Sequence, residues 1–475
     1  MHRYSRLVRG GAAVVATAGL AVLASCVGNV KDALLSAPDP DIINPSDVQS
    51  PEGAEALRIG ALSRLRTMTA GGESAWFYGG LLVDEWKSSD TFLERNAVDS
   101  RSVPDNNANV VTALRDVYRA RNSAREALND LVAFKPSPAA NIGQMYLVMG
   151  LAETFLAENF CNGTPLSDAS TGVVVYGPPL TNAEVFAVAL SHLDSALTLA
   201  TTGTQDANAI AIKNAILVAR GRVLVDLGRF SDAAAAVASV PTSFRLDGTY
   251  SLVSGSNQIW SLGTSAKRYT VGDSFDVTGV IKNSLPFASA NDPRVPVRGT
   301  STGTSPAGKG FDGATNLVIQ LLYGRVDPTA IVSGLDARLI EAEAKLSAND
   351  LAGMTAALNA LRASPPTIST FSGTGSTPGV SVPVVPTGLA PLATPATKDA
   401  AISLYFREKA FWTFGRGQRL SDLRREVRQY GRSQDQVFPT GTFHKGGPYG
   451  TDVNLPIHPD EQNNTQFTAC LDRNA

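Results

Sequence analysis

Apolar residues recur every three or four positions along several long segments of the chain, and polar residues fill most positions between them. This spacing places the apolar side chains on one face of an α-helix, so each segment is predicted to be an amphipathic helix. Thr181 begins one segment and is predicted to be its N-cap. The predicted helices cover residues 48–68, 110–134, 142–160, 181–200, 208–227, 230–240, 335–346 and 351–363.

Two pairs of these helices have the pattern of tetratricopeptide-type hairpins. In the pair over 208–240, small residues lie at the predicted helix crossing, Gly228 lies in the turn and Pro241 follows the second helix. The pair over 335–363 repeats the same spacing of alanine and leucine. Long segments separate the pairs, which argues against a plain solenoid, in which repeats stack without such interruptions.

We therefore predict a mainly α fold, a tetratricopeptide-like helical-pair superhelix with an irregular, loop-rich ligand-binding portion and few short strands. The helical repeats are expected at about 110–241 and 334–430, within a single domain over residues 47–475. The irregular insertions are expected at about 70–109, 242–333 and 364–397, because glycine, serine and proline are frequent there.

The segment 404–425 begins as an apolar-rich helix and ends in a basic stretch that contains one acid. Arg419, Asp422 and Arg425 recur every three residues, so they share one face of a helix and the carboxylate lies between two guanidinium groups. We predict that these three residues form structural ion pairs that hold the C-terminal part of the chain.

The N-terminal residues have the pattern of a signal peptide. Residues 1–10 are basic, residues 11–23 are small or apolar, and Cys26 follows Leu23-Ala24-Ser25. The apolar run is too short for a permanent membrane helix. The pattern resembles the bacterial lipobox, which implies a signal peptide over 1–25, lipid attachment at Cys26 and a tether over 26–46. The alternative is an ordinary secretory signal with an accidental cysteine.

Two further cysteines, Cys161 and Cys470, lie in loop-like surroundings. An exported protein meets an oxidising environment, so we predict that they form a disulfide across a very long loop. Two free, buried thiols are the competing interpretation.

Composition and motifs argue against nucleic-acid binding, metal binding and catalysis. The formal net charge is −2 and no basic stripe is present that would neutralise phosphates. The four histidines show neither HExxH nor Cys-His spacing, so we expect no metal and no cofactor. Residues 299–303 match the G-x-S-x-G pattern but lack the flanking strand and helix of a nucleophile elbow. The sequence thus indicates a binding protein and not an enzyme.

Short motifs, in the same order along the chain, resemble those of the SusD/RagB-like outer-membrane lipoproteins. In the Asp292-Pro293-Arg294 motif, the arginine can pair back to a carboxylate. The matching residues are Tyr118 with Asn122, Gly163-Thr164-Pro165-Leu166, Asn291-Asp292-Pro293-Arg294, Glu408, Gly417, Arg419, Asp422-Leu423-Arg424-Arg425, and Leu455-Pro456-Ile457 with Glu461.

The resemblance implies a protein that is lipid-anchored at the outer membrane, at the cell surface, and held to the membrane by its lipid alone. It implies capture of a glycan, oligosaccharide or peptide, and delivery to a SusC-like TonB-dependent barrel. Two other interpretations remain open. One is a helical-repeat envelope scaffold without a small ligand, and the other is a surface hydrolase.

Aromatic residues in the irregular insertions are the candidates for ligand contact, because stiff rings stack on sugars and on peptide side chains at low entropic cost. The alternative is that these rings belong to the core. The candidates are Trp76, Tyr78, Trp86, Trp260 and Tyr269.

Overall fold

The computed structural model describes residues 49–302, 307–372 and 379–475. The predicted signal peptide, the tether and Cys26 lie outside the described residues. The α-helices are α3 (Pro51–Ala70), α4 (Ala75–Leu82), α5 (Leu93–Asp99), α6 (Ala108–Phe134), α7 (Ala139–Asn159), α8 (Asn182–Ala200), α9 (Ala207–Asp226), α10 (Phe230–Val237), α11 (Gly334–Ser347), α12 (Leu351–Ala363), α13 (Lys398–Trp412), α14 (Arg419–Tyr430) and α15 (Gln434–Val437). A π-helix, η1 (Trp260–Ser265), and a 3-10 helix, η2 (Pro459–Asn463), complete the helical elements.

The described strands are short. They are β1 (Trp86–Ser88), β2 (Thr164–Pro165), β3 (Pro179–Leu180), β4 (Arg245–Gly248), β5 (Tyr269–Val271), β6 (Phe275–Asp276), β7 (Gly279–Val280), β8 (Val297–Arg298), β9 (Ile319–Gln320), β10 (Thr329–Ser333), β11 (Ile368–Phe371) and β12 (Ser381–Val384). They pair as two-stranded antiparallel ribbons, β1 with β5, β4 with β10, β11 with β12, β2 with β3, β6 with β7, and β8 with β9.

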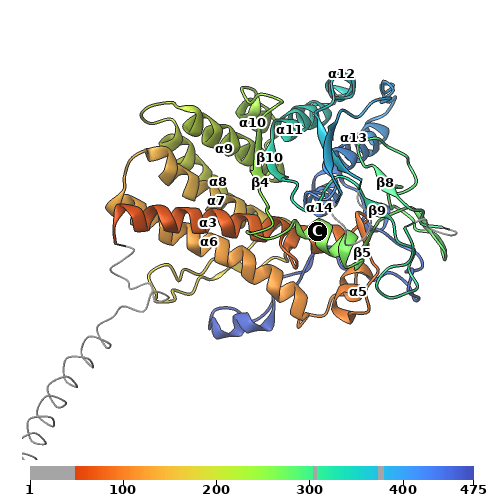
Figure 1. The fold of residues 1–475 in the computed structure, drawn as a ribbon, viewed down its shortest axis with the longest axis horizontal. Helices are drawn as coiled ribbons and strands as arrows, with labels where there is room; N and C mark the ends of the chain where they lie inside the picture. The colour runs from red at the N-terminus through yellow and green to blue at the C-terminus, as the bar shows by residue number, and fades with distance from the viewer. Residues whose placement is uncertain (1–48, 303–306, 373–378) are drawn as a thin grey trace, which may run out of the picture.

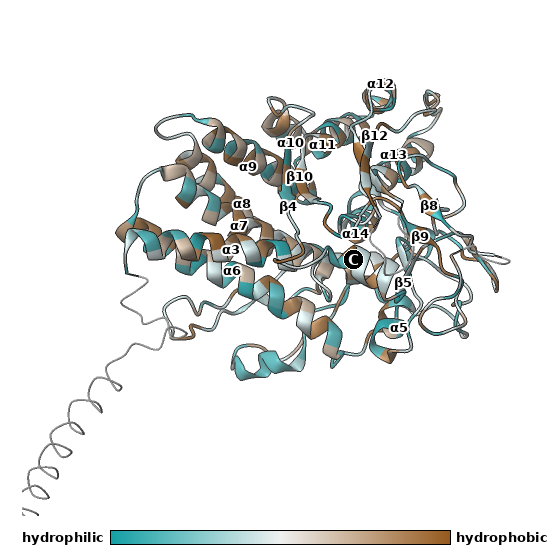
Figure 2. Cartoon of the chain, viewed as in Figure 1, coloured by the Kyte–Doolittle hydropathy of each residue, from teal (hydrophilic) through white to brown (hydrophobic). Residues whose placement is uncertain are grey.

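The helices form a continuous array in which α3 packs on α6 and each of α6 to α10 packs on the next helix, with α10 packing on α11. The array occupies one half of the molecule, and β5, β8 and β9 lie in the other half (Figure 1). Both apolar and polar residues lie along α8 and α9 (Figure 2). In α8 the buried residues Val185, Ala189, Leu193 and Ala196 recur every three or four positions, as an amphipathic helix requires. The predicted mainly α fold with helical pairs and few short strands is confirmed.

Local chemistry explains the helix boundaries. Thr181 caps α8 through a capping box with Glu184, as the sequence predicts for an N-cap threonine. Ser50 accepts a hydrogen bond from the Gly53 amide, and Pro51 occupies the first turn of α3, where its missing N–H costs nothing. α8 has the length and mean hydropathy of a membrane-crossing helix, yet it packs between α7 and α9 within the array.

The segment 404–425 is broken between α13 and α14. Gly415 and Gly417 lie in the connecting turn with φ of 71° and 63°, a region that favours glycine. A Cβ atom on Gly417 would lie 2.1 Å from Cδ1 of Trp76, so this turn also needs a residue without a side chain. The break directs α14 back into the centre of the molecule, where Arg419–Glu426 are all buried.

The ion pairs of α14 differ from the predicted arrangement at one end. Asp422 pairs with Arg425 (Nη2–Oδ1, 2.7 Å) as predicted, but its second cation is Lys409 of α13 (Nζ–Oδ1, 2.6 Å). Arg419 instead donates to Asp84, with an Nε–Oδ1 distance of 2.8 Å. The reason is that Arg419 is the first residue of α14, and its side chain reaches the turn that follows α4.

Glu85 is fully buried, and Oε1 accepts a hydrogen bond of 3.1 Å from the Gly415 amide. Burial raises its pKa to about 8, against the weaker opposing effect of this hydrogen bond. In an unfolded chain the pKa of the same carboxyl is about 4.3. Its contribution to folding stability is therefore complete below about pH 4 and is lost as the pH rises toward 8.

We expect Glu85→Gln to be more stable than the wild type at pH 8, by about 4 kcal/mol, and to match it more closely at pH 5. Urea denaturation at both pH values measures this difference. Glu52→Gln, at an exposed position of α3, is the control and should leave the pH dependence unchanged. A wild type that gains stability relative to Glu85→Gln as the pH rises would contradict the prediction.

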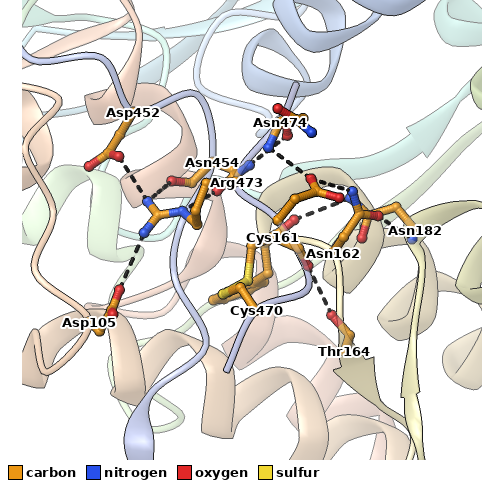
Figure 3. The surroundings of a disulfide bond; sticks show 12 residues. Asp105, Cys161, Asn162, Thr164, Asn182, Asp452, Asn454, Cys470, Arg473 and Asn474 are labelled. Atoms are coloured by element: carbon orange, nitrogen blue, oxygen red, sulfur yellow. Dashed lines mark hydrogen bonds and ion pairs between the residues drawn. A yellow bond between two sulfur atoms is a disulfide. The ribbon is translucent and has the colours of Figure 1, made fainter. Parts of the chain in front are cut away.

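Cys161 and Cys470 form a disulfide that joins positions 309 residues apart (Figure 3). The Cys161 amide donates to the Leu455 carbonyl at 2.9 Å. Close by, Arg473 bonds Asn454 (Nε–Oδ1, 2.7 Å) and pairs with Asp452 (Nη2–Oδ1, 3.2 Å). The C-terminal segment is thereby attached to the end of α7.

Candidate functional site

The structure places all five predicted ligand-contact rings in the interior, so the expectation that they lie exposed is wrong. Trp76, Tyr78, Trp86, Trp260 and Tyr269 are between 0 and 5% exposed. A ring covered on this scale cannot stack on a ligand in this conformation. Their positions agree with the alternative interpretation, in which these rings are core residues.

Ring packing gives the physical reason. α4 is apolar on every side, and each of its residues is buried. Its Phe77 stacks on Tyr269 of β5 with a centroid distance of 4.9 Å, and Trp86 of β1 lies 4.8 Å from Phe414. The contact between Phe77 and Tyr269 joins the insertion around residues 70–109 to that around 242–333 in one core, whereas Trp260 belongs to a separate, smaller core cluster with Leu317, Ile319 and Phe371.

All residues of the β1–β5 ribbon are buried, but one of them, Lys87, faces a cavity. Trp86 pairs with Val271 and Lys87 pairs with Thr270, in an antiparallel register. Successive strand residues point to opposite faces, so Trp86 enters the core while its neighbour Lys87 lines a cavity on the other side. The strand alternation around Trp86 was the signal in the sequence that could have identified Lys87.

This cavity, which we call the Lys87 cavity, has a volume of about 370 Å³. Polar and charged side chains provide most of its lining, together with Val277 of the β6–β7 turn. The lining residues used below are Lys87, Asp276, Asp312, Thr315, His444 and Lys445.

Lys87 supplies unused hydrogen-bond donors to the cavity. Its side chain is 8% exposed, and Nζ lies 3.6 Å from Oδ2 of Asp276, which is too long for a hydrogen bond. Lys87 donates no hydrogen bond to any described residue, and Oδ2 of Asp276 accepts none. The Lys87 ammonium and the Asp276 carboxylate thus lie close together, and both can still form hydrogen bonds with a ligand.

The opposite wall is held in place by ion pairs. Lys445 pairs with Asp312 at 2.9 Å and also donates to the carbonyl of Asp90. Burial pushes the pKa of Asp312 up, but its hydrogen bonds with Thr315 and Lys445 outweigh this and lower the pKa to about 2. Asp312 therefore stays ionised throughout the physiological range, and Lys445 is fixed beside it. His444 is held by Asp99, at 2.9 Å.

Two exposed aromatic rings lie beside this wall. Phe311 precedes Asp312 in the chain, and Phe92 follows Asp90 by two residues. The guanidinium of Arg268 lies 4.1 Å from the Phe311 centroid and 4.9 Å from the Phe92 centroid. The rings are 50% and 46% exposed, respectively. We call this group the Phe92–Phe311 platform.

Asp90 holds the Arg268 guanidinium in place between the two rings of the platform. Both of its carboxylate oxygens accept from Nη1 of Arg268, at 2.8 and 2.9 Å. Asp90 is fully buried and also pairs with Arg95, so the guanidinium that the two rings flank cannot rotate freely. Phe92 and Phe311 were not among the rings proposed from the sequence, because the sequence alone does not show which rings of an irregular segment face solvent.

The arrangement provides fixed donors and acceptors beside apolar ring faces. Each lysine of the Lys87 cavity has a carboxylate close by, so the cavity suits neutral, polar ligands better than phosphates. Among the described residues, no three His, Cys, Asp or Glu side chains are placed to hold a metal ion.

Comparison with known proteins finds matches among solved structures. No model of a protein family matches the sequence, and no curated protein matches it. Among solved structures, a SusD-like carbohydrate binding protein from Bacteroides vulgatus is similar with a TM-score of 0.60 and 13% identity, over 88% of this chain and 97% of that chain. A SusD homolog from Bacteroides thetaiotaomicron has a TM-score of 0.60 and 14% identity, over 90% and 99% of the two chains. A SusD/RagB family protein from the same species has a TM-score of 0.57 and 12% identity, over 86% and 94%.

Proposed function

We propose a function on the premise that this chain has the SusD-like fold: it is a non-catalytic nutrient-binding lipoprotein that captures a glycan. The observation that carries the proposal is the Phe92–Phe311 platform beside the Lys87 cavity. The solved structures of the same fold include one described as carbohydrate binding, which supports this choice of ligand class.

A sugar ring matches this site in two respects. Its C–H face is apolar and stacks on an exposed aromatic ring, which Phe311 and Phe92 provide. Its hydroxyl groups both donate and accept hydrogen bonds, which suits the unused donors of Lys87 and the unbonded oxygen of Asp276. Stacking sets the position of the sugar on the platform, and the cavity then selects the pattern of hydroxyl groups.

The site predicts separate effects on binding and on stability. We expect Lys87→Met to weaken glycan binding at least about tenfold, since a hydrogen bond to a charged group contributes about 1.5–3 kcal/mol. We expect Phe311→Ala to weaken it about tenfold as well, because the variant loses the ring on which the sugar stacks. The melting temperature of Phe311→Ala should change by less than about 2 °C, because its ring is half exposed. A glycan array followed by isothermal titration of the best oligosaccharide measures binding.

Two matched variants serve as controls. Lys345→Met removes an exposed lysine of α11, and Tyr176→Ala removes a ring that is 42% exposed and lies outside the site. Both should bind the oligosaccharide like the wild type. Equal losses in site variants and controls, or no loss in Lys87→Met, would place the glycan elsewhere.

Attachment and delivery form the second part of the proposal. The lipobox-like sequence before Cys26 supports acylation of that cysteine and anchoring at the outer membrane, at the cell surface. From there the protein would deliver its ligand to a SusC-like TonB-dependent barrel. Purification from native outer membranes in mild detergent should recover a large β-barrel partner in stoichiometric amount. Recovery of the protein alone would favour the envelope-scaffold interpretation.

A further inference from the structure

A second, larger cavity lies between two β-ribbons and the end of α13. Its volume is about 650 Å³, which is in the range of small-molecule sites. The β4–β10 ribbon contributes Arg245 and Ala330, the β11–β12 ribbon contributes Ile368 and Pro383, and α13 contributes Trp412. No residue of the Lys87 cavity lines it.

Aromatic rings form much of the buried lining of this cavity. Phe411, Trp412 and Phe414 contribute rings from the end of α13 and the turn after it. Tyr323 also lines the cavity, but its hydroxyl donates to the Phe414 carbonyl at 2.7 Å, so its hydrogen-bonding capacity is used inside the protein. Leu322 adds an aliphatic surface. An occupant therefore meets mainly carbon atoms.

The two buried arginines of the lining carry no uncompensated charge. Arg416 makes a two-fold ion pair with Asp336, with Nη1–Oδ1 and Nη2–Oδ2 distances of 3.0 and 2.7 Å. Arg294 pairs with Asp292 and with Glu408, each at 2.7 Å. A charged ligand would lose its hydration here without gaining an unpaired counter-charge.

Hydroxyl groups without a hydrogen-bond partner among the described residues lie at the rim. Thr242, Ser243, Ser364 and Thr367 are exposed, and their hydroxyls make no hydrogen bond with another residue of the described chain. Deeper in the cavity, the indole N–H of Trp412 is buried and has no acceptor in the part of the chain that the structure describes. An occupant with an uncharged oxygen or nitrogen near its surface would satisfy these groups.

We infer that this cavity binds a neutral, mainly apolar small molecule, consisting of an aromatic or branched aliphatic body with one or two uncharged polar atoms. This site is separate from the glycan site of the proposed function and does not depend on it. Apolar burial against the rings supplies the affinity, and the compensated arginines exclude ions.

A matched pair of fluorescent probes tests the inference. N-phenyl-1-naphthylamine is neutral, and 8-anilinonaphthalene-1-sulfonate has nearly the same rings with a sulfonate added. We expect the neutral probe to bind saturably, with one site per chain and a Kd in the micromolar range, and the anion to bind at least tenfold more weakly. No saturable binding of the neutral probe, or equal binding of the anion, would overturn the inference.

A substitution at the rim tests whether the neutral probe binds in this cavity. Thr367→Trp places a large side chain at the exposed rim and should weaken binding of the neutral probe at least tenfold, whereas Thr204→Trp, in the exposed loop after α8, should not. Circular dichroism melting shows whether both variants are folded. An unchanged Kd in Thr367→Trp would place the probe outside this cavity. Lys87→Met should leave probe binding intact, and Thr367→Trp should leave glycan binding intact, so either proposal can fail alone.

Discussion

Replacing Cys161 and Cys470 together by serine is expected to lower the free energy of unfolding by about 3–5 kcal/mol. The bridge joins positions 309 residues apart, so its loss releases a very long loop in the unfolded chain, and the stabilising effect of a cross-link grows with loop length. Urea denaturation under non-reducing conditions measures the change. Peptide mapping without reductant should first recover the two cysteines in one linked fragment.

Reduction of the wild type provides the control, because it breaks the same bond without changing a side chain. The reduced wild type and the double variant should unfold at the same urea concentration within error. A loss below about 1 kcal/mol would mean that the hydrogen bonds around Cys161 and Arg473 hold the C-terminal segment without help from the disulfide.

Arg425→Ala is expected to destabilise the protein by about 3–5 kcal/mol, the cost of breaking a buried ion pair from one side. The side chain of Arg425 is 2% exposed and pairs with Glu343 and Asp422, which are equally buried. Among the described residues, removing the guanidinium leaves Asp422 paired with Lys409 and leaves Glu343 with two hydroxyl donors, Tyr405 and Tyr430. Equilibrium denaturation at pH 7 measures the loss.

Arg229→Ala is the matched control. Arg229 also pairs with a carboxylate three residues away, Asp232, but both side chains are at least half exposed. Exposed pairs contribute little, so this variant should differ from the wild type by less than about 0.5 kcal/mol. Similar losses in Arg425→Ala and Arg229→Ala would show that the buried network contributes packing and not charge pairing.

Helical periodicity predicted most of the array because it is a local property. The pair α9 and α10 and the pair α11 and α12 begin and end within a few residues of their predicted limits. The break after α13 was not predicted, because it depends on Gly417 lying against Trp76, more than 300 residues away in sequence. The partner of Arg419 was missed for the same reason, since Asp84 is equally distant.

The candidate site was the least predictable part. Hydrophobic rings in an irregular segment pack inward or outward according to strand pairing, and the β1–β5 register is formed by residues far apart in sequence. Composition alone cannot distinguish Trp86, which faces the core, from Phe311, which faces solvent. The segment over 70–109 was expected to be irregular, but it contains the short helices α4 and α5, because α4 is apolar on every side and shows no amphipathic period in the sequence.

The alternation within β1 and β5 has a practical consequence for engineering. Within β1, Trp86 belongs to the packed core while its neighbour Lys87 lines the cavity, so a mutant library restricted to Lys87 and to exposed lining residues such as Val277 and Ala314 would sample new selectivities without disturbing the packed rings. Directed evolution of this region should therefore yield a high proportion of folded clones.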